Sequence, residues 1–223
     1  MSDHTLDLTR QSGIIPTEKV AQAHITIVGA GAIGSHLAEC LAKMGISKLS
    51  VYDYDTVEKH NLPNQGYQLG DLGELKVDAL KKRLEEGYGC IVDAYNMKVE
   101  ETTELPTDIV VAAVDSMKAR KAILKACESS MEPIILIDPR MGAQYGEIRL
   151  VDLLDQEQIT GYSSGMISDD EAYQAPCTEK ATIFCASGMA AFITSMIALI
   201  IRNEKAPAFV EMDFARMLVS TAA

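Results

Sequence analysis

The chain has 223 residues, of which 48% are hydrophobic and 23% are charged, and its formal net charge is −12 at pH 7. This length is most simply one domain, large enough to bury a full core. The acidic balance argues against a duplex nucleic-acid surface, which needs clustered Lys and Arg. The first residues are polar and resemble no secretory signal, so we expect a cytoplasmic protein.

Strand and helix patterns alternate over the first 140 residues. Apolar runs predict strands at 25–28, 49–52, 91–95, 109–114 and 134–137. Between them, helical patterns cover 33–44, 75–84 and 118–127. Strands separated by helices indicate right-handed β-α-β units. The sequence therefore predicts an α/β fold, a Rossmann-like, doubly wound sheet that is mainly parallel.

The pattern changes after Pro139. Residues 147–151 predict a strand, and residues 209–219 predict one or two more. The stretch 155–180 is polar, and we expect it to lack regular structure and to be mobile or functional. We therefore expect one domain, 1–223, with a nucleotide-binding half at 1–140 and a substrate-binding and dimer half at 141–223. Antiparallel strands at the C-terminal end extend the parallel sheet.

Residues 181–201 run without a charge and are long enough to cross a bilayer. The run also contains threonines, serines and a glycine, and the chain has no second segment like it. A helix that is apolar all round is equally what a domain core or subunit interface requires. We favour a buried core helix and expect no membrane association.

The five cysteines are odd in number, and no two form a C-x-x-C pair; they are Cys40, Cys90, Cys127, Cys177 and Cys185. A disulfide framework is not expected in so long and so regularly patterned a chain. We expect no zinc, because the paired ligand spacing of structural zinc sites is missing.

A glycine motif, Gly29, Gly31 and Gly34 in G-x-G-x-x-G spacing, lies between the first predicted strand and its helix. Such a turn brings a phosphate to the amides at the start of a helix. Asp53 ends the second predicted strand, 19 residues after Gly34, where an acid binds ribose hydroxyls. These features fit an NAD(P)-dependent oxidoreductase as well as an ATP enzyme.

Three further segments are less generic: D-Y-D-T-V-E-K-H-N-L-P-N-Q at 53–65, G-E-L-K at 73–76 and V-D-S-M-K-A-R at 114–120. With T-R-Q at 9–11 and the segment 138–147, they make nearly the whole chain resemble the ThiF/MoeB/HesA superfamily. These are adenylyltransferases related to ubiquitin-activating enzymes. The chain departs from the family where Asn64 replaces the arginine of N-L-x-R-Q, and where the C-x-x-C zinc ligands are absent.

The resemblance implies a role for each matching residue. The three glycines, Asp53 and Asn61 would bind ATP. Lys76 would neutralise the α-phosphate during attack, and Asp115 would hold Mg²⁺. Arg10 would reach the triphosphate bound by the partner subunit, since family members act as homodimers. The partner implied is a small ubiquitin-like or sulfur-carrier protein with a Gly-Gly tail.

Cys177 lies in A-P-C-T-E, where some relatives carry a cysteine used in thioester or persulfide chemistry. A reactive cysteine must be accessible and readily ionised, and the polar stretch offers access. An unreactive cysteine fits the sequence equally well. The departure at Asn64 also motivates a third reading, in which the chain is a catalytically inactive adenylation-fold subunit that binds a partner.

Overall fold

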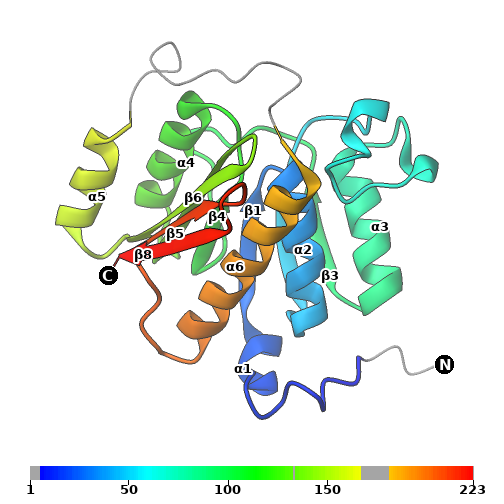
Figure 1. The fold of residues 1–223 in the computed structure, drawn as a ribbon, viewed down its shortest axis with the longest axis horizontal. Coiled ribbons are helices and arrows are strands. Elements are labelled where there is room, and N and C mark those ends of the chain that lie inside the picture. The colour runs from blue at the N-terminus through cyan, green and yellow to red at the C-terminus, as the bar shows by residue number, and fades with distance from the viewer. Residues whose placement is uncertain (1–5, 133, 167–180, 223) are drawn as a thin grey trace.

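The computed structural model describes residues 6–132, 134–166 and 181–222. One eight-stranded sheet runs through the molecule in the order β3-β2-β1-β4-β5-β6-β7-β8 (Figure 1). The first five strands of that order are parallel and the last three pairings are antiparallel. This confirms the predicted Rossmann-like sheet with an antiparallel C-terminal extension. The strands are β1 (His24–Val28), β2 (Lys48–Tyr52), β3 (Ile91–Tyr95), β4 (Ile109–Ala112), β5 (Ile135–Gly142), β6 (Tyr145–Asp152), β7 (Phe209–Asp213) and β8 (Leu218–Ala222).

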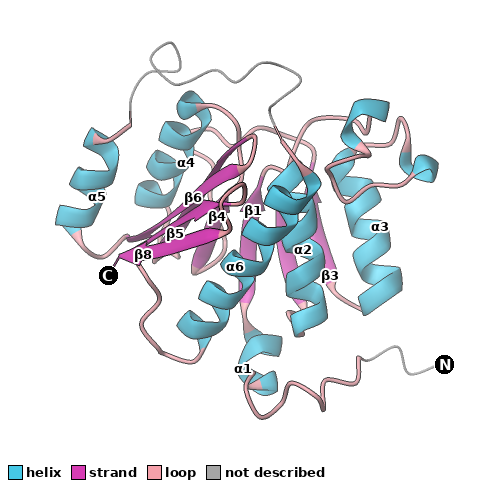
Figure 2. Cartoon of the chain, in the orientation of Figure 1, coloured by secondary structure: helices cyan, strands magenta, loops and turns pink. Residues whose placement is uncertain are grey.

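Helices cover both faces of the sheet (Figure 2). They are α1 (Thr17–Gln22), α2 (Ala32–Met44), α3 (Lys76–Tyr88), α4 (Met117–Ser129), α5 (Gln156–Ser164) and α6 (Ile183–Ile201), with short 3-10 turns η1 (Lys59–Asn61) and η2 (Leu69–Asp71). Helices α2, α3 and α6 share one core cluster with one face of the strands. Helices α4 and α5 share the other cluster. Successive residues of a strand point to opposite faces of the sheet, so Val111 lies in the first cluster and Val110 in the second.

The structure corrects the expected polar loop at 155–180. Residues 156–164 form α5, and residues 167–180 lie outside the described part of the chain. Asp155 caps α5, because its carboxylate accepts hydrogen bonds from the amides of Glu157 (2.9 Å) and Gln158 (3.3 Å). Ile159 and Tyr162, three positions apart, are its buried side chains. A short helix with only two apolar anchors gives little periodicity, and this is why the polar composition misled the prediction.

Helix α6 is long and apolar enough to cross a membrane by length and composition, and 44% of that apolar window is buried inside the protein. It packs against α2 and against β5 and β6, as a core helix does. Gly188 lies so close to Phe214 that an added Cβ would come within 2.6 Å of its ring. Gly188 of α6 therefore serves close packing within the domain.

Candidate nucleotide-binding site

The glycine motif forms the turn that joins β1 to α2. Gly29 has φ of 98°, and a Cβ there would lie 2.3 Å from the carbonyl oxygen of Ala113. A Cβ on Gly34 would lie 1.8 Å from the carbonyl oxygen of Gly29. By contrast, a Cβ on Gly31 would have no atom within 4 Å. Packing thus requires the outer two glycines, whereas the middle one faces open space that a ligand can approach.

The N-terminus of α2 opens onto that space. Gly31 is the N-cap of the helix, and no side chain caps it. The first amides of a helix have no partner within the helix, and the helix dipole adds partial positive charge at this end. An uncapped N-terminus at a glycine turn can bind a phosphate, and phosphate binding by Gly29, Gly31 and Gly34 stays a prediction.

Asp53 lies at the carboxyl end of β2, beside the turn. Its carboxylate accepts hydrogen bonds from the amide of Ala30 (2.7 Å) and from the amide of Asp55 (2.8 Å). Burial raises the pKa of Asp53 above its ordinary value, although these two hydrogen bonds oppose the shift. Each carboxylate oxygen has two lone pairs, so the group keeps acceptor capacity for ribose hydroxyls.

Lys76 is the first residue of α3, and its side chain is only 6% exposed. Its ammonium lies 2.9 Å from a carboxylate oxygen of Asp55, which is half exposed. The amide of Lys76 also donates to the carbonyl of Asp55. These contacts hold the start of α3 against the end of β2. The sequence did not predict the Lys76–Asp55 ion pair. A D-x-D motif and a lysine far along the chain allow such a pair but do not specify it.

Asn61 lies in η1 and is 6% exposed. Its side-chain oxygen accepts from the amide of Glu58 at 2.8 Å, which leaves its amide nitrogen as a donor. Asn64 follows on the same segment. Its amide nitrogen donates to the carbonyl of Ala181 at 3.5 Å, and its buried oxygen has no partner among the described residues. An amide therefore occupies the position at which the family carries a guanidinium.

Asp115 is exposed on the bend that follows β4. Because β4 pairs with β1, this bend lies next to the glycine turn, and the close approach of Gly29 to Ala113 confirms the contact. The chain crosses from one side of β1 to the other at this point, and open α/β sheets bind ligands in the crevice that results. A buried ion pair anchors the helix after the bend: Arg120 Nε lies 2.7 Å from Asp138 Oδ1.

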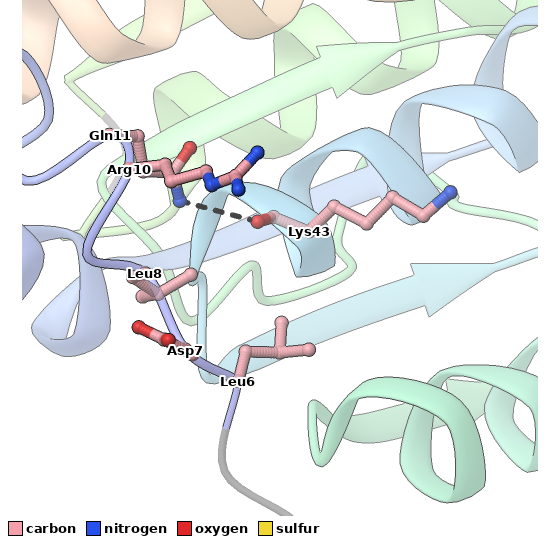
Figure 3. Close-up of a pocket in the computed structure, with 6 residues that line it drawn as sticks. All are labelled: Leu6, Asp7, Leu8, Arg10, Gln11 and Lys43. Atoms are coloured by element: carbon pink, nitrogen blue, oxygen red, sulfur yellow. Dashed lines mark hydrogen bonds between the residues drawn. The ribbon is translucent and has the colours of Figure 1, made fainter.

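Arg10 lies away from this crevice. Its neighbour Gln11 donates to the carbonyl of Met44 at 3.0 Å, and Arg10 lines a pocket of about 300 Å³ with Lys43 (Figure 3). Lys43 and Met44 end α2, whereas the glycine turn begins it, and a helix of 13 residues is about 20 Å long. Arg10 is therefore remote from the glycine turn of its own chain. Cys177 lies outside the described residues.

The described residues contain no cluster of three His, Cys, Asp or Glu side chains placed to hold a metal ion. Mg²⁺ does not require one, because it is commonly held by one or two carboxylates together with substrate phosphates and water. A single carboxylate such as Asp115, exposed at the crevice, fits that mode of binding. Cys185 is fully buried, as expected of a core residue.

The sheet order, the glycine turn and the acid after β2 define a Rossmann-like nucleotide-binding domain. The chain belongs to the ThiF family, whose sequence profile matches residues 5–222. It is 31% identical over 135 residues to ubiquitin-like modifier-activating enzyme 5 of Bombyx mori, a match that covers 53% of this chain and 34% of that protein. The same enzyme of Rattus norvegicus is 32% identical over 153 residues, a match that covers 57% of this chain and 38% of that protein. The matched part is thus little more than a third of these relatives.

Solved structures of E. coli MccB share the fold. The complex of MccB with succinimide superposes with a TM-score of 0.76 at 17% identity, covering 98% of this chain and 72% of that one. The complex of MccB with ATP superposes with a TM-score of 0.73 at 16% identity, covering 99% of this chain and 73% of that one. At this identity the likeness concerns the fold alone.

Proposed function

We propose that this chain is an ATP-dependent adenylyltransferase that activates the C-terminal carboxylate of a small ubiquitin-like or sulfur-carrier protein. The observation that carries the proposal is Lys76: a buried ammonium held by Asp55, next to Asp53, in a chain of the ThiF family. A hydride-transfer enzyme has no need of a cation there. Two relatives are named as ubiquitin-like modifier-activating enzymes, and one neighbour was solved with ATP.

The reaction joins two anions. A carboxylate oxygen of the carrier attacks the α-phosphorus and forms a new P–O bond. The bond between the α-phosphorus and the oxygen that bridges the α- and β-phosphates breaks, and pyrophosphate leaves. The protein must place the reactants and balance the charge, with little covalent work of its own. In this proposal the ammonium of Lys76 leaves the Asp55 carboxylate and pairs with the α-phosphate, where negative charge accumulates. The half-exposed Asp55 carboxylate can be solvated when the ammonium leaves it.

The remaining residues bind the nucleotide. The amides of the glycine turn receive phosphate, Asp53 accepts from the ribose hydroxyls, and Asn61 donates its amide nitrogen to phosphate oxygen. Mg²⁺, if held by Asp115, would neutralise the leaving pyrophosphate. The position of Arg10 at the far end of α2 supports a role in trans, in which each subunit of a homodimer contributes Arg10 to the other's site.

A second candidate function rests on Asn64. A guanidinium supplies a charged, bidentate fork that an amide cannot replace. The chain would then be an inactive subunit that retains the fold and binds a partner. The two candidates differ in one variant: under the second, Asn64→Arg would create exchange activity that the natural chain lacks.

ATP–pyrophosphate exchange tests the main proposal. Exchange should depend on a carrier that ends in a free Gly-Gly carboxylate and should stop when that terminus is amidated. Thermal shift with Mg-ATP and with NAD separates this function from that of an oxidoreductase. If Mg-ATP gave no stabilisation and a panel of carriers gave no exchange, the proposal would be wrong.

A further inference from the structure

Tyr67 lies on the segment between η1 and η2, beside the glycine turn, and is 6% exposed. Its hydroxyl donates to the carbonyl oxygen of Ala30 at 2.7 Å and also lies 3.4 Å from the carbonyl oxygen of Lys76. One side chain therefore touches both parts of the candidate site, the glycine turn and the first residue of α3. The resemblance to the ThiF family assigned no role to this residue.

The contact with Ala30 fixes a peptide plane. The carbonyl of Ala30 and the amide of Gly31 belong to the same planar, trans peptide and point in opposite directions. Because the Tyr67 hydroxyl holds the Ala30 carbonyl, the Gly31 amide points away from Tyr67. A Cβ on Gly31 would meet nothing within 4 Å, so the neighbourhood of that residue is open.

Ala30 is held from both ends. Its amide donates to Asp53 Oδ2 at 2.7 Å, while its carbonyl accepts from Tyr67. The next carbonyl, that of Gly31, accepts from the hydroxyl of Ser35 at 2.6 Å, and Ser35 in turn accepts from the amide of Gly66 at 2.8 Å. Adjacent residues of one segment, Gly66 and Tyr67, thus secure two successive peptides of the turn.

The surroundings of Tyr67 keep it in this role. Burial raises the pKa of the phenol well above its ordinary value, and the nearby Asp53 carboxylate adds to the shift. Like any tyrosine the hydroxyl keeps its proton at neutral pH and can donate it, and the raised pKa extends this range to more alkaline pH. The guanidinium of Arg83 lies 5.8 Å from the centre of the ring, at cation–π distance, and packs against it.

We propose that Tyr67 is a positioning residue: its hydroxyl sets the Ala30–Gly31 peptide so that the Gly31 amide faces the nucleotide phosphates, and joins the turn to the start of α3. This inference rests on the proposed function for its ligand but makes a claim about the apo protein as well. Preorganised amides bind an anion without a reorganisation cost at the moment of binding.

The test compares Tyr67→Phe with Tyr88→Phe in the full chain. Phenylalanine keeps the ring and removes only the hydroxyl. Tyr88 is a matched control, because it ends α3, and its hydroxyl donates to Glu39 of α2 at 2.8 Å, far from Lys76. Titration calorimetry with Mg²⁺ and a non-hydrolysable ATP analogue should show about five- to tenfold weaker binding for Tyr67→Phe, the effect of one lost buried hydrogen bond. Binding by Tyr88→Phe should match that of the natural chain.

Hydrogen exchange of the apo protein supplies the readout that does not depend on ATP. Peptides covering 29–36 should exchange several-fold faster in Tyr67→Phe than in Tyr88→Phe. If the natural chain bound no nucleotide, the proposed function would fail. Amide hydrogen exchange at the glycine turn would then decide whether Tyr67 positions the turn. Unchanged exchange at the turn, or equal nucleotide affinity in both variants, would overturn this inference.

Discussion

Replacing Lys76 with methionine isolates the charge at the centre of the proposed reaction. Methionine keeps most of the apolar stem in a site where the lysine side chain is 6% exposed. Loss of one preorganised electrostatic contact to a developing anion costs about 3–4 kcal/mol, or 10²–10³-fold in rate. We therefore expect carrier-dependent ATP–pyrophosphate exchange by Lys76→Met to fall by about that factor.

The fold should survive this change. The ion pair with the half-exposed Asp55 contributes at most about 1 kcal/mol, because solvent screens it. For a domain of this size that corresponds to a fall in Tm of no more than about 4 °C. Lys82→Met, an exposed lysine on the same helix, is the control and should keep full activity. Exchange within tenfold of the natural chain in a folded Lys76→Met protein would refute the reasoning.

Four further variants test the packing and the charges. Gly34→Ala should lower Tm by about 6 °C or more in a circular-dichroism melt, because its Cβ would overlap a backbone oxygen at 1.8 Å. Gly31→Ala should melt near the natural chain but bind Mg-ATP more weakly by calorimetry; equal melting of the two glycine variants would contradict the packing argument. Asn64→Arg should raise exchange activity, and a loss would show that the amide serves the reaction. Asp138→Ala should lower the free energy of unfolding in urea by about 3–5 kcal/mol, because it leaves the buried Arg120 without its carboxylate partner and leaves Arg140 with Glu147 alone; a change below 1 kcal/mol would count against that network.

Most of the parallel half was predictable because its signals are local. Residues 91–95 form a strand with the expected bounds, and 25–28 and 49–52 each gain one residue at the start. Fully buried strands read as continuous apolar runs, and the glycine turn follows directly from spacing. The 209–219 stretch also divides into two strands, as one of the two expected readings had it, and the second strand continues past the predicted end to Ala222.

What the sequence did not reveal depends on contacts between distant residues. The hydroxyl of Tyr67 reaches Ala30 across 37 positions, and the Lys76–Asp55 pair spans 21. No periodicity encodes such pairs. The short helices α1 and α5 were missed because each has few apolar anchors, Val20 in one, and Ile159 and Tyr162 in the other.

Trapping the acyl-adenylate with hydroxylamine tests the central claim most directly. A carrier with a Gly-Gly carboxylate, incubated with this protein, ATP and Mg²⁺, should acquire a C-terminal hydroxamate visible in its intact mass. The product should disappear without ATP and fall by about 10²–10³-fold with Lys76→Met. The account would be contradicted if a carrier that supports ATP–pyrophosphate exchange gave as much hydroxamate with Lys76→Met as with the natural chain. It would also be contradicted if the protein bound ATP and modified no carrier.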